Sequence, residues 1–203
     1  MSDDKGIKIV LLGEAGVGKT NLIQVSIGKK FDENTSSTLT GSYVEKEYIF
    51  ENKKYIFDLW DTVGQELYRS LSKLFIKNSK IVIIVFAINS RPSFEQIEFW
   101  YNSVKESLGD DGYITALVGN KSDLYEDPEA IPDEEMEKKA KEMNLKLKIT
   151  SACKDAEGFK SFLNELMEDY IKIYKPEGVK DDGKTKFKIG GDKSKTKGKK
   201  KCC

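Results

Sequence analysis

A run of glycines, a lysine and a threonine at residues 13–20 has the composition and spacing needed to hold phosphate groups. The segment reads Gly-Glu-Ala-Gly-Val-Gly-Lys-Thr and directly follows an apolar run. Glycines let successive backbone N–H groups curl around an anion, and a helix that begins after them adds the positive end of its dipole. Lys19 can then reach the β and γ phosphates of a nucleotide, while the Thr20 hydroxyl can ligate Mg²⁺. A glycine-rich turn without a ligand is the alternative, and the predicted strand-to-helix setting favours phosphate binding.

A second polar motif, Asn120-Lys121-Ser122-Asp123, follows another apolar run. Guanine presents an N1–H and an N2 amine as parallel donors that the Asp123 carboxylate can accept bidentately, whereas adenine presents an acceptor at that ring position. Asn120 can satisfy acceptors on the base, and the alkyl stem of Lys121 can lie over its face. The tetrapeptide alone also fits a solvated loop. Its place at the carboxyl end of a predicted strand, where open α/β sheets bind ligands, favours recognition of guanine.

The third motif, Asp61-Thr62-Val63-Gly64-Gln65, ends a further apolar run. In a nucleotide hydrolase Asp61 can hold Mg²⁺ through a water, the Gly64 N–H can face the γ-phosphate, and Gln65 can orient the attacking water. A polar turn after a buried strand is the alternative for this segment taken by itself.

Alternating apolar runs and helix-period stretches predict the elements that must position these motifs. Six strands are expected at residues 7–12, 43–50, 55–60, 81–88, 114–118 and 145–149. The second and third are separated by only four residues, which is too short for a parallel crossover, so they are expected to form an antiparallel hairpin. Helices are expected from Ser93, as a capping-box residue, to about Leu108, from Pro132 onward, and from Asp155 or Ala156 to Tyr174. The predicted fold is an α/β P-loop NTPase domain, with a mostly parallel six-stranded sheet and about five helices.

Charge is divided unevenly along the 203 residues, although 34 Lys plus Arg balance 34 Asp plus Glu. Residues 175–203 hold eleven Lys and four acids, a net +7, which leaves −7 for the rest. The chain has no His, which excludes His-based catalysis, and its longest apolar run, residues 81–88, is far below the roughly 18–20 residues of a membrane span. We expect a short extension at residues 1–6, one domain at 7–174 and a disordered tail at 175–203. Three Cys without a disulfide pattern predict a cytoplasmic setting.

The motifs together resemble those of a Ras-superfamily small GTPase, and most closely the Rab family, over residues 7–174 and at the terminus. The resemblance implies Gln65 and Lys19 as catalytic residues, and Thr20, Thr38 and (through water) Asp61 as the Mg²⁺ site. It also implies that Phe31 stacks on guanine and that Ser151 and Ala152 contact the guanine oxygen. The full nucleotide-binding set, for GTP or GDP, is Glu14, Ala15, Gly16, Val17, Gly18, Lys19, Thr20, Asn21, Phe31, Thr38, Gly64, Asn120, Lys121, Asp123, Ser151, Ala152 and Cys153.

Further implications of the resemblance concern partners and the membrane. Tyr43, Trp60 and Phe75 fall where Rab proteins place an aromatic trio read by effectors, although a core or hairpin-surface role is equally consistent with their chemistry. The ending Lys-Lys-Lys-Cys202-Cys203 resembles the Rab terminus that receives two geranylgeranyl groups. The expected partners are an exchange factor, a GTPase-activating protein, a GDP-dissociation inhibitor or escort protein, a geranylgeranyl transferase and effectors. A monomer on the cytosolic face of an intracellular membrane is expected, and nucleic-acid binding is not.

Several positions depart from the Rab pattern, so alternatives to a hydrolytic trafficking switch stay open. Ala15 replaces the usual Ser, Val63 the usual Ala, Thr40 the usual Gly, and Cys153 the Lys that normally covers guanine. A protein that holds GTP but scarcely hydrolyses it would keep every motif. A metabolic phosphotransferase would need an acceptor pocket and a lid, for which the sequence has no motif. The Lys-rich tail could also be only a solubilising segment.

Overall fold

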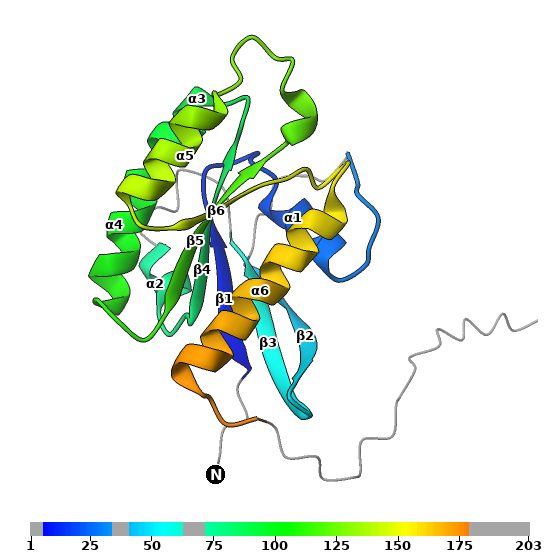
Figure 1. Cartoon of the computed structure of the whole chain (residues 1–203), viewed down its shortest axis with the longest axis vertical. Coiled ribbons are helices and arrows are strands. Elements are labelled where there is room, and N and C mark those ends of the chain that lie inside the picture. Colours follow the sequence, from blue (N-terminus) through cyan, green and yellow to red (C-terminus); the bar gives the residue numbers. More distant parts are fainter. Residues whose placement is uncertain (1–5, 34–40, 63–71, 179–203) are drawn as a thin grey trace, which may run out of the picture.

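A single six-stranded sheet forms the centre of the computed structural model, which describes residues 6–33, 41–62 and 72–178. Its strands run in the order β2-β3-β1-β4-β5-β6 (Figure 1). Their bounds are β1 Ile7–Leu12, β2 Ser42–Phe50, β3 Lys53–Asp61, β4 Ile81–Ala87, β5 Ile114–Asn120 and β6 Lys146–Ile149. Only β2 pairs antiparallel, and the other four pairings are parallel. The predicted sheet is therefore confirmed: six of the twelve strand ends coincide with the prediction, and the other six differ by one or two residues.

Two hydrophobic cores lie on opposite faces of the sheet because successive side chains of a strand point to opposite faces. Ile9 and Leu11 of β1 belong to one core, and Val10 and Leu12 belong to the other. All seven residues of β4 are buried, as expected for a central parallel strand covered on both faces.

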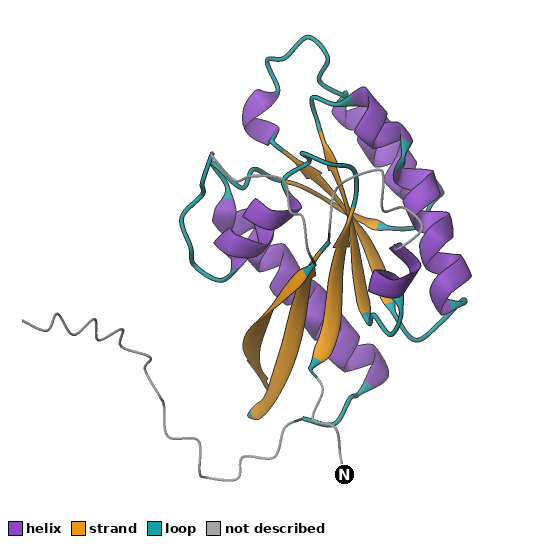
Figure 2. Cartoon of the chain, turned by 180° about the vertical axis from the view of Figure 1, so that it is seen from behind, coloured by secondary structure: helices purple, strands orange, loops and turns teal. Residues whose placement is uncertain are grey.

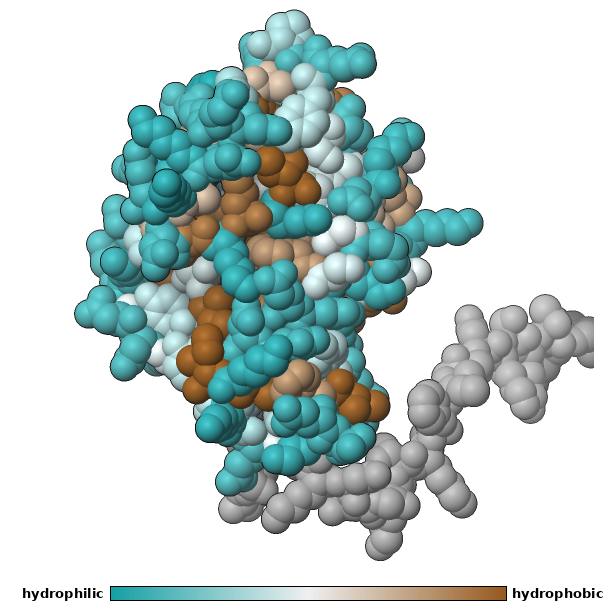
Figure 3. All heavy atoms as spheres, viewed as in Figure 1, coloured by the Kyte–Doolittle hydropathy of each residue, from teal (hydrophilic) through white to brown (hydrophobic). Residues whose placement is uncertain are grey.

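Helices cover both faces of the sheet. α1 (Lys19–Ser26) and α6 (Ala156–Tyr174) contribute to the core that contains Ile9, and their outer surface is mostly hydrophilic (Figures 1 and 3). The other face, seen from behind in Figure 2, carries α2 (Ser72–Ile76), α3 (Arg91–Glu95), α4 (Ile97–Leu108) and α5 (Asp133–Glu142). A short 3₁₀ helix, η2 (Ser122–Leu124), follows β5. None of the helices in the described ranges is long and apolar enough to cross a bilayer.

The β2–β3 hairpin is tighter than the sequence pattern predicted. Its strands extend to Phe50 and Lys53, so only Glu51 and Asn52 form the turn, both with positive φ (49° and 59°). This is the backbone pattern of a type I′ turn, whose twist matches that of the flanking strands. Polar Lys53 and Lys54 concealed the start of β3, because the prediction relied on apolar residues.

The helix expected from Ser93 begins earlier and consists of two parts. Ser90 is the N-cap, and its Oγ accepts a hydrogen bond from the Ser93 N–H, so the assignment of Ser93 as the cap was wrong. The Ser93 Oγ instead bonds the backbone of Ala87 and Ser90. Gln96 separates α3 from α4, and counting those two as one bent helix gives five helices around the sheet within the described ranges, the number expected.

Candidate functional site

The glycine-rich loop between β1 and α1 has a backbone that demands glycine at two positions. Gly13 and Gly18 have φ values of 141° and 96°. A Cβ on Gly13 would lie 2.1 Å from the Val85 carbonyl oxygen, and one on Gly18 would lie 2.3 Å from Asn120 Nδ2. The loop is thus pressed against β4 and β5, and its backbone conformation is the curled one that an anion-binding loop requires.

Lys19 lies inside this loop and is only 5% exposed. Its Nζ donates to the carbonyls of Gly13 at 2.7 Å and Glu14 at 2.8 Å. Burial lowers the pKa of Lys19 to about 8, and the negative charges of Asp61 and Glu14 oppose that shift. Lys19 is thus a buried cation whose hydrogen-bond partners are neutral carbonyls and whose pKa is lowered. The negative charge of an approaching phosphate would stabilise its charged form.

Asn120, at the end of β5, connects the loops of the site. Its Nδ2 donates to the Val17 carbonyl at 2.8 Å, and its Oδ1 accepts from the Ala152 N–H at 3.1 Å. The side chain is 1% exposed. The sequence interpretation assigned Asn120 to the base alone, and the structure adds that it joins the phosphate loop to the loop after β6.

Asp123 is oriented by Ser151, whose Oγ donates to Asp123 Oδ1. Ser151 in turn accepts from the N–H groups of Cys153 and Lys154, at 3.1 and 3.0 Å. Lys121 adopts a left-handed conformation (φ 67°) immediately before η2. The segments after β5 and β6 therefore fix the Asp123 carboxylate at the end of the cavity opposite the phosphate loop. A carboxylate there can accept hydrogen bonds from two parallel donors on a base.

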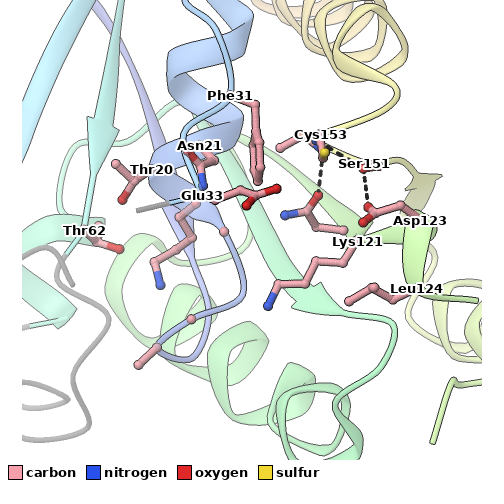
Figure 4. A pocket seen from close by; sticks show the side chains of 16 residues that line it. Thr20, Asn21, Phe31, Glu33, Thr62, Lys121, Asp123, Leu124, Ser151 and Cys153 are labelled. Carbon is pink, nitrogen blue, oxygen red and sulfur yellow. Dashed lines mark hydrogen bonds between the residues drawn. The ribbon is translucent and has the colours of Figure 1, made fainter. Parts of the chain in front are cut away.

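These segments border a cavity of about 370 Å³, within the range of small-ligand sites (Figure 4). Most of the described residues predicted to bind a nucleotide line it, namely Ala15, Gly16, Gly18, Lys19, Thr20, Asn21, Phe31, Asn120, Lys121, Asp123, Ser151, Ala152 and Cys153. Glu14 and Val17 do not line it. The backbone carbonyl of Glu14 holds Lys19, that of Val17 holds Asn120, and the Val17 side chain belongs to the core.

Three lining residues were not predicted from sequence: Glu33, Thr62 and Leu124. Thr62 Oγ1 donates to the Leu11 carbonyl at 2.6 Å and so ties the end of β3 to β1. Leu124 follows directly on the residues of the second motif, so its proximity to them in sequence was an available signal. Glu33 had no signal beyond its distance of two residues from Phe31.

The oxygen groups near Lys19 fit a hard cation such as Mg²⁺ in partnership with phosphates. The Thr20 hydroxyl lines the cavity, and the carboxylate of Asp61, 5% exposed, is close enough to Lys19 to affect its pKa. Within the described ranges no cluster of three or more His, Cys, Asp or Glu could hold a metal unaided. The set is what Mg²⁺ uses when a nucleotide supplies further ligands.

Several predicted residues lie outside the described part of the chain: Thr38, Gly64 and Gln65, and the terminal Cys202 and Cys203. Of the aromatic trio, Tyr43 and Trp60 stack across the hairpin with ring centroids 5.1 Å apart, and Tyr43 is 51% exposed. Phe75 is half-buried and lies against Gly41, where a Cβ would be 2.4 Å from its ring.

A glycine loop after β1, a buried lysine and an oriented carboxylate after β5 define a P-loop nucleotide-binding α/β domain. The sequence matches the family described as the Ras family over residues 8–172, and the chain belongs to that family. The protein is therefore a small GTPase of the Ras superfamily, a class of nucleotide-dependent switches. Such proteins bind GTP and GDP, typically with Mg²⁺, and generally act with exchange factors, activating proteins and effectors.

Proposed function

We propose that this chain is a Rab-like GTPase that alternates between GTP-bound and GDP-bound states and recruits trafficking effectors when GTP is bound. The observation that carries the proposal is a single cavity with a buried lysine-containing phosphate loop at one end and an oriented Asp123 at the other. The aromatic stack on the hairpin and the Lys-rich Cys-Cys ending support the Rab branch.

In the proposed complex the chain's own groups bind and orient GTP. Asp123 accepts the two parallel donors of guanine, Phe31 covers the ring, and Lys19 neutralises charge on the β and γ phosphates. Thr20, Thr38 and Asp61 would hold Mg²⁺, which when bound supplies further neutralisation of the charge that develops on the phosphates. Gln65 orients the attacking water.

Hydrolysis without a partner is expected to be slow because no arginine lines the described cavity. Arg91 is instead paired with Glu135 of α5. Arg69, the other arginine of the chain, lies outside the described residues. An activating protein that inserts an arginine could add about 10³–10⁵ to the rate.

The switch itself rests on the γ-phosphate contacts proposed for Thr38 and Gly64. Loss of that phosphate would release both segments and change the surface read by effectors beside Tyr43, Trp60 and Phe75. The lipidated tail would hold the protein on the cytosolic face of an intracellular membrane, since two geranylgeranyl groups and a +7 segment provide the two signals that stable anchoring takes.

A second candidate function is a GTP-binding module with very weak hydrolysis. It is favoured by one specific observation, the methyl group of Ala15 at the wall of the cavity. A side chain there narrows the space that Gln65 needs on its approach to the nucleotide.

Single-turnover hydrolysis by purified protein distinguishes the two functions. We expect a rate on the order of 10⁻⁴ s⁻¹ that falls at least tenfold in Gln65→Leu. Gln96→Leu, a matched change between α3 and α4, is the control and retains the wild-type rate. A fast rate that is insensitive to Gln65→Leu would refute the proposed mechanism, while no measurable turnover with tight GTP binding would favour the second function.

The membrane part of the proposal has its own test. Protein from a prenylating host is expected to float with liposomes that contain anionic lipid, and a variant with both Cys202 and Cys203 changed to Ser is expected to stay in the soluble fraction. Equal flotation of the two proteins would refute anchoring through this terminus.

A further inference from the structure

The outermost strand of the sheet, β2, has one edge without a partner strand in the described part of the chain (Figure 1). It pairs only with β3. Alternate backbone N–H and C=O groups of an edge strand point away from its neighbour, so the nine residues of β2 offer a template for one more strand. An extended segment that added there would gain main-chain hydrogen bonds, and its side chains would decide whether it fits.

One face of β2 is mainly apolar along this edge. Val44, Tyr48 and Phe50 lie partly buried against the core that α1 and α6 cover. Lys46, which lies between them, donates from Nζ to the Ser26 carbonyl at the end of α1 at 3.0 Å, so its charge is directed toward that helix. The half-buried side chains leave room for apolar neighbours from an added strand, and such cross-strand pairs stabilise a sheet.

The other face of β2 is acidic. Glu45 and Glu47 are exposed on it, and Lys54 of β3 pairs with Glu47 at 2.6 Å. Glu45 lies directly opposite Asp58 of β3, whose pKa is raised by burial and then by the negative charge of Glu45. This face of the hairpin thus carries three acids and one lysine, and a cation beside Glu45 would be stabilised.

The tail contains one segment with the alternation typical of a strand, residues 184–189. It reads Lys-Thr-Lys-Phe-Lys-Ile and has a glycine at each end. Lysines therefore alternate with Thr185, Phe187 and Ile189, which are β-branched or aromatic residues that favour strands. As a strand the segment would have one basic face and one mainly apolar face. These two faces complement the acidic and apolar faces of β2.

The chain leaves the domain close to this edge. Gly178 lies against the start of β3, where a Cβ on it would be 3.1 Å from the Lys54 carbonyl oxygen. A strand added beyond β2 would be two strand spacings from β3, or about 10 Å. The six residues from Gly178 to Lys184 span up to about 20 Å, so the segment reaches the edge. Since β2 runs toward the hairpin turn and the tail starts there, the added strand would run antiparallel to β2.

We propose that residues 184–189 add to the free edge of β2 as a further, antiparallel strand of the same chain. In this arrangement the three lysines lie beside Glu45 and Glu47, and the other three side chains extend the half-buried face. The tail is expected to be disordered by itself, so this segment becomes ordered as it docks. Docking closes the edge to other chains and withholds three of the eleven tail lysines from any anionic surface. The inference depends neither on nucleotide binding nor on lipidation.

Hydrogen exchange of individual β2 amides, measured by NMR on the full-length protein produced without lipid, tests the inference. Amides at an edge that is covered nine-tenths of the time exchange about tenfold more slowly than amides at an open edge. The test variant reverses the three lysines of the segment: Lys184→Glu, Lys186→Glu and Lys188→Glu. The matched control reverses three lysines with the same spacing beyond it: Lys193→Glu, Lys195→Glu and Lys197→Glu. We expect the test variant to lose the protection and the control to keep it.

Two further variants separate strand addition from simple attraction of charges. Phe187→Pro keeps every charge but removes an N–H and a ring from the middle of the segment, so it should expose the edge as fully as the test variant. Glu45→Lys with Glu47→Lys should also expose it. Combining that pair with the test variant should restore protection to within about threefold of wild type, since the opposite charges face each other again. Exchange in the buried strand β4 reports whether each variant is folded.

Four outcomes would overturn the inference. If wild-type β2 amides exchange as fast as those of the test variant, the edge is open. If Phe187→Pro keeps the protection, the tail is attracted by charge and no strand forms. If the control variant loses as much protection as the test variant, the attraction is not specific to residues 184–189. If the protection increases with protein concentration, the segment comes from a second copy and the intramolecular strand is refuted.

Discussion

Replacement of Asn120 by Ala should weaken the fold and the nucleotide site together, since its amide joins two loops of the site. Truncation leaves the buried Val17 carbonyl and Ala152 N–H without the partners they have at 2.8 and 3.1 Å. Each unsatisfied buried group costs about 1–3 kcal/mol, so the loss of both partners should lower the free energy of unfolding by about 2–6 kcal/mol. For a domain of this size that is a decrease in Tm of roughly 4–24 °C. GDP affinity should fall more than tenfold.

Urea unfolding followed by circular dichroism, at a fixed excess of GDP and Mg²⁺ and again without them, measures both effects. Asn120→Asp tests the geometry, because it keeps the acceptor for Ala152 but sets a carboxylate oxygen against the Val17 carbonyl, and it should be no more stable than Asn120→Ala. Asn102→Ala, at an exposed position of α4, is the matched control and should change stability by less than about 0.5 kcal/mol. If Asn120→Ala behaved like that control, the bridging role would be refuted.

Three further predictions concern the same cavity. Burial lowers the pKa of Lys19 to about 8, and bound phosphates favour its charged form, so GDP binding above pH 8 takes up a proton. Affinity should therefore fall as pH rises from 8 to 10, by at most about tenfold per unit, and titration calorimetry at pH 9 in buffers of different ionisation enthalpy measures the uptake. Gly18→Ala should lower GDP affinity by at least about 100-fold, because its Cβ would meet Asn120 Nδ2. Gly28→Ala is the control, since Gly28 also has positive φ but its Cβ would lie in open space. It should lower the free energy of unfolding by only about 1–2 kcal/mol in parallel urea titrations. Cys153→Lys should tighten GDP binding by roughly threefold to tenfold in competition with a fluorescent GDP, since the alkyl stem would cover more of the base; unchanged affinity would contradict that role.

The parts of the fold that followed from sequence are those where burial dictates residue type. β1, β4 and β5 are covered on both faces, so their apolar runs were unambiguous. β3 begins with two lysines because the hairpin end is exposed, and a rule based on apolar residues placed its start two residues late. The α3 start was misplaced because Ser90 and Ser93 are both residue types that suit an N-cap. The structure separates their roles, because Ser90 Oγ accepts from the Ser93 N–H and Ser93 Oγ accepts from the Ala87 N–H.

The sequence pointed to cavity-lining residues where side-chain chemistry and spacing form a motif, as at Lys19 and Asp123. Glu33 could not be identified in that way, because an acid in a polar loop is the ordinary solvated residue until the fold turns it inward. The bridging role of Asn120 was equally invisible, since it depends on backbone groups 103 and 32 residues away in the sequence.

The cavity and the last described residue, Gly178, lie at opposite ends of the sheet. The cavity is lined by segments at the carboxyl ends of β1, β3, β5 and β6 and by Phe31 and Glu33 after α1. In contrast, α6 runs back to the other end of the sheet, where Gly178 lies against the first residues of β3 (Figure 1). The six residues of β1 alone separate these ends by about 20 Å. The last described residue, Gly178, therefore lies at the hairpin end of the sheet, and the cavity lies at the opposite end. A partner that binds at the cavity and one that binds at the hairpin end therefore do not compete for the same part of the domain.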